Sequence, residues 1–207
     1  MIPIGRVAWL KVGFFDRDPR RVARALLGKL LIRKTPRGML AGRIVETEAY
    51  LGEDDEAAHS FVGKTARNAV LFGPPGRAYV YFIYGNHYCL NVSCLGDGIA
   101  GGVLFRALEP VAGIEEMAAA RGVTVKKPAE LRKISSGPGR MAEALGVTRE
   151  RDNDKSFVSP KSDLRIGDDG YRARRVLVTP RIGIVKSAAM PLRYLLGGNR
   201  FVSGSRM

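Results

Sequence analysis

Capping and turn residues, with apolar-rich runs between them, predict a helix followed by two strands in the first quarter of the chain. Asp18-Pro19 has the pattern of a helix N-cap followed by proline at the first helical position, so we expect a helix over 20–27. Apolar-rich runs predict strands over 29–34 and 43–50, joined through the turn residues Thr35-Pro36-Arg37-Gly38.

The middle of the chain has the pattern of a β-hairpin. Residues 77–84 and 88–94 are rich in aromatic and β-branched side chains and flank the short polar tip Gly85-Asn86-His87. The other expected elements are a long ordered loop with one short helix over 52–76, strands over 102–108, 174–178 and 182–185, and helices over 110–121 and 140–145. We therefore predict a mixed α/β (α+β) fold: one compact domain over residues 1–207, with a curved antiparallel sheet, a protruding hairpin and flanking helices.

Composition narrows the class of protein. The 207 residues are 45% hydrophobic, which is enough for a core and argues against disorder. No apolar run approaches the ~18 residues that a transmembrane helix needs, and two cysteines fit a reducing compartment better than a disulfide scaffold. The formal net charge of +14 favours a polyanionic partner, nucleic acid first.

The positive charge is unevenly distributed. Residues 1–50 carry a net +7 and residues 111–207 a net +9, whereas residues 51–110 carry a net −2. From residue 50 onward this near-neutral centre holds five of the seven tyrosines and both histidines. The pattern indicates basic flanks that hold an anion around an aromatic centre with a local task, although tyrosine-rich strands also form ordinary cores.

Two carboxylates lie on one face of a predicted strand. Because side chains alternate along a strand, Glu46, Glu48 and Tyr50 share a face. Carboxylates in an apolar strand are costly to bury, and functional sites are one place where that cost is accepted. A solvent-facing strand with salt-bridged glutamates explains the pattern equally well, and the spacing does not favour either glutamate.

The hairpin tip carries a candidate wedge. Tyr84, beside Gly85, can project as an aromatic side chain that enters a base stack, or it can fold back on its own hairpin. A metal site is not expected, because Cys89 and Cys94 have no zinc-motif spacing and Asp97 lacks neighbouring carboxylates for magnesium.

Six sequence blocks, in this order along about residues 14–203, resemble the alkyladenine (3-methyladenine, methylpurine) DNA glycosylase family. They are Arg43-Ile44-Val45-Glu46-Thr47-Glu48-Ala49-Tyr50-Leu51-Gly52, Asp55-Glu56-Ala57-Ala58-His59-Ser60, Tyr79-Val80-Tyr81-Phe82-Ile83-Tyr84-Gly85, Cys89-Leu90-Asn91-Val92-Ser93, Arg106-Ala107-Leu108-Glu109-Pro110 and Ser136-Gly137-Pro138. The combination is highly specific, whereas a single block is not.

The resemblance implies a role for each matching position. Glu48, rather than Glu46, matches the catalytic glutamate, and Arg106 matches the arginine that helps to hold its water. The backbone near Ile182 matches a carbonyl that also positions this water. The remaining matches are the base-stacking residues Tyr50, His59 and Tyr81, the guanine-excluding amide Asn91 and the intercalating wedge Tyr84.

The implied activity is that of a monofunctional hydrolase in base excision repair. It flips alkylated purines out of double-stranded DNA and releases them with a Glu-activated water, as a monomer without cofactor, metal or membrane. The expected location is the nucleoid region of the cytoplasm in a prokaryote or the nucleus in a eukaryote. No lysine stands in the motifs around Glu48, so lyase chemistry through a Schiff base is not expected. The alternatives are a non-catalytic module that binds damaged DNA or RNA on the same fold, and a metal-dependent nuclease.

Four positions depart from the family pattern. Phe61-Val62 replaces a more polar stretch that often contains arginine, Asn86 stands where methionine is common, and Ala66 stands where proline often occurs. These departures concern contacts with DNA and the packing of the wedge, and they leave the catalytic set intact.

Overall fold

A computed structural model describes residues 7–204, and all of its strands there belong to one antiparallel sheet. Along the sheet the order is β1-β7-β2-β3-β6-β5-β4, and the β8–β9 pair joins through β9 to β3. The strands are β1 (Ala8–Trp9), β2 (Leu30–Thr35), β3 (Gly38–Tyr50), β4 (Ala78–Ile83), β5 (His87–Ser93), β6 (Gly102–Ala112), β7 (Leu164–Asp168), β8 (Val176–Thr179) and β9 (Arg193–Leu196). The predicted mixed α/β class and antiparallel sheet are confirmed.

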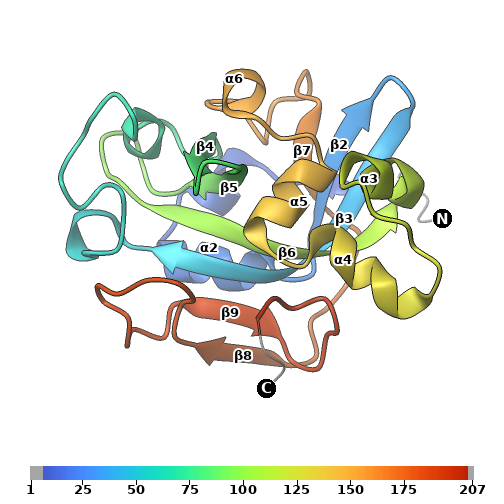
Figure 1. Ribbon diagram of the computed structural model, residues 1–207. Helices are drawn as coiled ribbons and strands as arrows, with labels where there is room; N and C mark the ends of the chain where they lie inside the picture. Colours follow the sequence, from blue (N-terminus) through green and yellow to red (C-terminus); the bar gives the residue numbers. More distant parts are fainter. Residues whose placement is uncertain (1–6, 205–207) are drawn as a thin grey trace.

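Helices α2 and α5 flank the long β3–β6 pair at the centre of the molecule (Figure 1). Asp18 caps α2 as predicted, because its carboxylate accepts the Arg20 amide at 2.8 Å and Pro19 follows at the first helical position. The α-helices are α1 (Val12–Phe15), α2 (Pro19–Leu26), α3 (Ile114–Ala120), α4 (Arg132–Ser135), α5 (Pro138–Ala144) and α6 (Arg149–Asp152), and the short 3₁₀ helices are η2 (Gly52–Asp54), η3 (Ala69–Phe72) and η4 (Pro128–Leu131).

Strand β3 organises the sheet because it changes partner along one edge. Its first half pairs with β2, and Glu46, Thr47 and Glu48 in its second half pair with β9. On its other edge β6 runs along most of its length, with register shifts at Ala41/Gly42 and around Glu46. Such irregularities bend a strand and increase its twist, which accounts for the predicted curvature.

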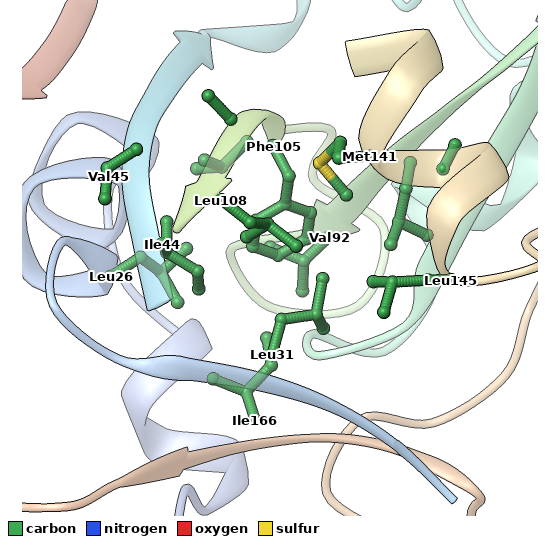
Figure 2. Close-up of a cluster of buried hydrophobic side chains, with 14 of the residues drawn as sticks. Leu26, Leu31, Ile44, Val45, Val92, Phe105, Leu108, Met141, Leu145 and Ile166 are labelled. Carbon is green, nitrogen blue, oxygen red and sulfur yellow. The ribbon is translucent and has the colours of Figure 1, made fainter. Parts of the chain in front are cut away.

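The core gathers apolar side chains from strands and helices that are distant in sequence (Figure 2). Each such side chain contributes about 1.5–3 kcal/mol when it is fully buried. The labelled members are Leu26, Leu31, Ile44, Val45, Val92, Phe105, Leu108, Met141, Leu145 and Ile166, all of them 1% exposed or less. This packing holds β3 and β6 rigidly, and both strands carry candidate site residues.

One predicted element starts at the wrong residue and another is absent. The helix expected over 110–121 is α3, which starts only at Ile114, because Pro110 and Ala112 extend β6 and pair with Gly42 and Ala41 of β3. The strand expected over 182–185 is absent; Gly183 has a φ of 78° there and Val185 is 93% exposed.

Other sequence predictions differ in detail. The predicted loop over 52–76 contains two short 3₁₀ helices rather than one helix, and the strand predicted over 174–178 is β8, two residues later at its start. The hairpin is confirmed as β4 and β5. The elements that were not predicted are strands β1, β7 and β9, helices α1, α4 and α6, and the 3₁₀ helix η4.

A buried ion pair ties β2 to α6. Arg33 donates to both carboxylate oxygens of Asp152, at 2.9 and 2.7 Å, and both side chains are fully buried. Arg33 also donates to Asp163 at 3.0 Å. The Arg33 side chain therefore connects two segments that are more than a hundred residues apart in the sequence.

We expect Arg33→Met to lower the free energy of unfolding by about 3–5 kcal/mol, because Asp152 would keep a buried charge without its main partner. Arg20→Met is the control, since the ion pair of Arg20 with Asp18 is largely exposed and contributes less than about 1 kcal/mol. Urea unfolding followed by circular dichroism measures both. Equal effects of the two substitutions would contradict the assignment.

Candidate active site

Both glutamates of β3 are completely buried. Glu46 and Glu48 have exposed fractions of 0%, so the solvent-facing strand that the sequence left open is wrong. Arg106 on β6 reaches both: its Nε donates to Glu46 Oε1 at 3.1 Å, and its Nη1 lies 3.1 Å from Glu48 Oε1. Burial alone would lower the pKa of Arg106, but the charges of Glu48 and Glu46 outweigh it and raise that pKa.

Glu46 is fully engaged in structural contacts. Its Oε1 accepts hydrogen bonds from Arg106, from Arg193 Nε at 2.6 Å and from the Ser203 hydroxyl at 3.0 Å, and its Oε2 accepts the Ser203 amide at 2.6 Å. Arg193 lies on β9 and Ser203 beyond it. Glu46 therefore connects β9 and Ser203 to β3, and two of its three partners, Arg193 and Ser203, line neither the cavity nor the pocket described below.

Glu48 lies behind side chains and backbone that line a cavity, and it lines no cavity itself. Besides Arg106, it accepts the Ile182 amide at 2.8 Å on Oε1 and the Tyr50 hydroxyl at 3.0 Å on Oε2. These three partners all line a cavity of about 320 Å³. The family resemblance matched the backbone near Ile182 to a carbonyl that positions the water. The Ile182 group that contacts Glu48 is its amide N–H.

An aromatic pocket adjoins this cavity. It has a volume of about 140 Å³, and the two spaces share the lining residues Tyr50, Tyr81, Ile83 and Ile184. His59 and Tyr81 meet edge to face with ring centroids 4.5 Å apart, and His59 Nδ1 lies 2.9 Å from the Tyr79 hydroxyl. The structure thus brings Tyr50, His59 and Tyr81 together in one pocket.

The aromatic pocket is uncharged at neutral pH. Burial, with a smaller effect of Arg67, lowers the pKa of His59, which keeps its imidazole neutral. Burial raises the pKa of Tyr81, and burial together with the Glu48 charge raises that of Tyr50. Neutral aromatic faces attract cations, and no cationic side chain lines this pocket to oppose them.

Asn91 and Tyr79 complete the pocket wall. The Asn91 side-chain amide donates to the Tyr79 carbonyl at 3.1 Å, which fixes its orientation. Tyr79 was not among the predicted site residues. Its place two residues before Tyr81, on the same face of β4, is the signal that could have identified it.

Tyr84 projects from the tip of the β4–β5 hairpin. Its side chain is 80% exposed, so it does not fold back on its own hairpin, and its φ of 55° lies in the left-handed region. Tyr84 also lines the cavity of about 320 Å³, and so does Ile182, although the two residues are far apart in the sequence. Phe61 and Val62, which depart from the family pattern, are exposed at 41% and 77%.

The described residues hold no candidate metal centre. Within 7–204, no group of three or more His, Cys, Asp or Glu side chains is arranged to hold an ion, and Cys89 and Cys94 are buried free thiols. Over the same range, no helix is long and apolar enough to cross a membrane.

Sequence reasoning missed three residues that shape the site. Arg193 and Ser203 saturate Glu46, and Arg181 forms a buried ion pair with Asp55 next to Ile182. No local pattern marks any of them, because each acts on a residue more than a hundred positions away.

The sequence is similar to those of known proteins. A relative from Koribacter versatilis (strain Ellin345) is 68% identical over 203 residues, which are 98% of this chain and 97% of that protein. One from Burkholderia cenocepacia (strain HI2424) is 45% identical over 93% of this chain and 89% of its own length, and one from Methanocella arvoryzae is 45% identical over 83% and 82%. All three carry the name "Putative 3-methyladenine DNA glycosylase".

The family described as "Methylpurine-DNA glycosylase (MPG)" matches residues 13–200, a span that includes β3, the hairpin, Arg106 and Arg193. With that coverage and a relative at 68% identity, the chain belongs to the methylpurine-DNA glycosylase family.

Proposed function

We propose that this protein hydrolyses the N-glycosidic bond of methylated purines, 3-methyladenine among them, in double-stranded DNA, as the first step of base excision repair. The observation that carries the proposal is Glu48: a buried carboxylate held by three donors, all of which line a cavity that adjoins the aromatic pocket and is also lined by Tyr84. The family of the chain and the names of its relatives support the same activity.

The aromatic pocket would receive the damaged base. A base inside a duplex is out of reach of Glu48, so the nucleotide must rotate out of the stack, at a cost of a few kcal/mol that is lowest for damaged pairs. Tyr84 would fill the space that the nucleotide leaves. Tyr50, His59 and Tyr81 would stack on the extruded base, and Asn91 would test its hydrogen-bonding edge.

Charge would select the lesion. Alkylation at N3 or N7 makes the purine cationic, and each good contact of a cation with an aromatic face is worth about 1 kcal/mol. The same positive charge weakens the glycosidic bond by making the base a better leaving group. The basic flanks of the chain would hold the phosphates, so that affinity falls steeply with salt.

Glu48 would activate the attacking water. An ionised carboxylate there would accept a proton from water as it attacks C1′ and would stabilise positive charge that develops on the sugar. Arg106 and the Ile182 amide hold this carboxylate in place, through an ion pair at 3.1 Å and a hydrogen bond at 2.8 Å. Glu48 is the carboxylate of the pair that this chemistry would use, because all three of its partners line the cavity, whereas the Glu46 partners Arg193 and Ser203 line neither space.

We expect Glu48→Gln to slow the release of 3-methyladenine from alkylated duplex DNA by at least about 100-fold, the lower range of a general base contribution. Single-turnover base release measures this rate, and a gel-shift assay should find lesion binding retained. Glu56→Gln, in the exposed loop before His59, is the charge-matched control and should keep the wild-type rate.

An unchanged release rate in Glu48→Gln would overturn the catalytic assignment and favour the non-catalytic binding module. Full activity of the unmodified protein in EDTA would exclude the metal-dependent nuclease.

Tyr84→Ala should weaken binding to a lesion-containing duplex by about 1–3 kcal/mol, the usual value of an aromatic–base stack. Affinity for undamaged duplex should change little, because the phosphate contacts remain. Tyr84→Phe keeps the ring and should retain lesion affinity. Titration of both variants against matched damaged and undamaged duplexes tests the wedge, and a Tyr84→Ala variant with wild-type discrimination would refute it.

A further inference from the structure

Arg181 is a fully buried cation that lines neither cavity. Its guanidinium donates to the Asp55 carboxylate, with Nη2–Oδ1 at 2.8 Å, and to the Ala49 carbonyl at 3.0 Å. The guanidinium carbon also lies 4.5 Å from the centroid of the Tyr50 ring. Since Tyr50 lines both cavities and Arg181 lines neither, Arg181 supports this ring from the side that faces away from them.

Asp55 extends the hold of Arg181 to the loop that carries His59. Its carboxylate accepts the amides of Leu51 at 3.3 Å and Ala57 at 3.1 Å, so it bridges both ends of the turn after β3. This turn is tight, because a Cβ at Gly52 would lie 2.1 Å from the Ala100 carbonyl oxygen. Asp55 therefore links Arg181 to the segment that leads into His59, whose carbonyl also accepts the Asn68 side-chain amide at 2.8 Å.

The backbone that follows Arg181 reaches the candidate catalytic carboxylate. Ile182, the next residue, donates its amide to Glu48 at 2.8 Å. Residues 180–184 form no helix or strand, so hydrogen bonds of regular structure do not fix this amide. The side chain of Arg181, held by Asp55 and the Ala49 carbonyl, is the anchor next to it.

We propose that Arg181 is a positioning residue for base release: one buried cation that sets the Tyr50 ring, the His59 loop and the Ile182 amide relative to one another. The inference rests on the proposed function, because its effect on rate passes through Glu48. Arg181 lines neither the aromatic pocket nor the cavity beside it, and so it acts on base release only through these three groups.

A purely structural role is the competing explanation, and the chain offers a matched control for it. The Arg33–Asp152 pair is also bidentate and fully buried, and neither residue lines the two cavities. If Arg181 merely stabilised the fold, the loss of either pair would have the same consequence for activity.

The experiment compares Arg181→Lys with two charge-neutral double variants, Arg181→Met/Asp55→Asn and Arg33→Met/Asp152→Asn. Lysine keeps the charge but cannot reproduce the forked contacts of arginine together with its stacking on the ring. We expect Arg181→Lys to reduce the single-turnover rate of 3-methyladenine release by about 10–100-fold, because small misplacements of reacting groups cost up to about 100-fold. The dissociation constant for undamaged duplex should not change.

The double variants distinguish an effect on the position of the reacting groups from an effect on the stability of the fold. Arg181→Met/Asp55→Asn should lose more rate than Arg181→Lys, whereas Arg33→Met/Asp152→Asn should lower the unfolding midpoint but keep the wild-type rate below it. If the first double variant does not fold, Arg181→Lys alone decides. Wild-type rates in a folded Arg181→Lys, or an equal loss of rate in the Arg33 double variant, would overturn the proposal.

Glu48→Gln in the same assay distinguishes failure of the positioning role from failure of the proposed function. An inactive Glu48→Gln beside a fully active Arg181→Lys would remove the positioning role and leave the proposed function intact. An active Glu48→Gln would remove the proposed function itself.

Discussion

The structure depends on the burial of two carboxylates on one strand. Glu46 and Glu48 are both shielded from water, and such charges are tolerated in a protein interior only when they are paired and hydrogen-bonded. Arg106 serves both, and Arg193 and Ser203 complete the partners of Glu46. The two glutamates are alike in sequence context, and what separates them is where their partners lie: all three partners of Glu48 line the cavity, whereas Arg193 and Ser203 do not.

The distribution of charged residues explains why a basic protein has an uncharged pocket. Its positive residues are concentrated in the flanking segments, where they can meet phosphates at the surface. The pocket presents rings whose ionisation burial suppresses, with a carboxylate just beyond them. A cationic ligand would therefore meet less repulsion at the centre of the protein than at its basic surface.

Local sequence signals predicted the elements that local interactions form. Asp18-Pro19 located α2, and the aromatic hairpin appeared where its pattern placed it. The helix expected from Pro110 is present as α3, but it starts four residues later because pairing with β3 extends β6 through Pro110 to Ala112. Alternation put both glutamates on one face but could not rank them, since the partner Ser203 is 157 positions from Glu46. The resemblance to a family, rather than spacing, singled out Glu48.

The attachment of Ser203 to Glu46 has a consequence for the order of events during synthesis. Chains emerge from the ribosome N-terminus first, so β3 and its two acidic side chains appear long before residues 193–203. Until then Glu46 lacks Arg193 and Ser203, which supply three of its four hydrogen bonds, and burying its charge is correspondingly less favourable. The interior around β3 therefore gains its full stability only when residues 193–203 are present, near the end of synthesis.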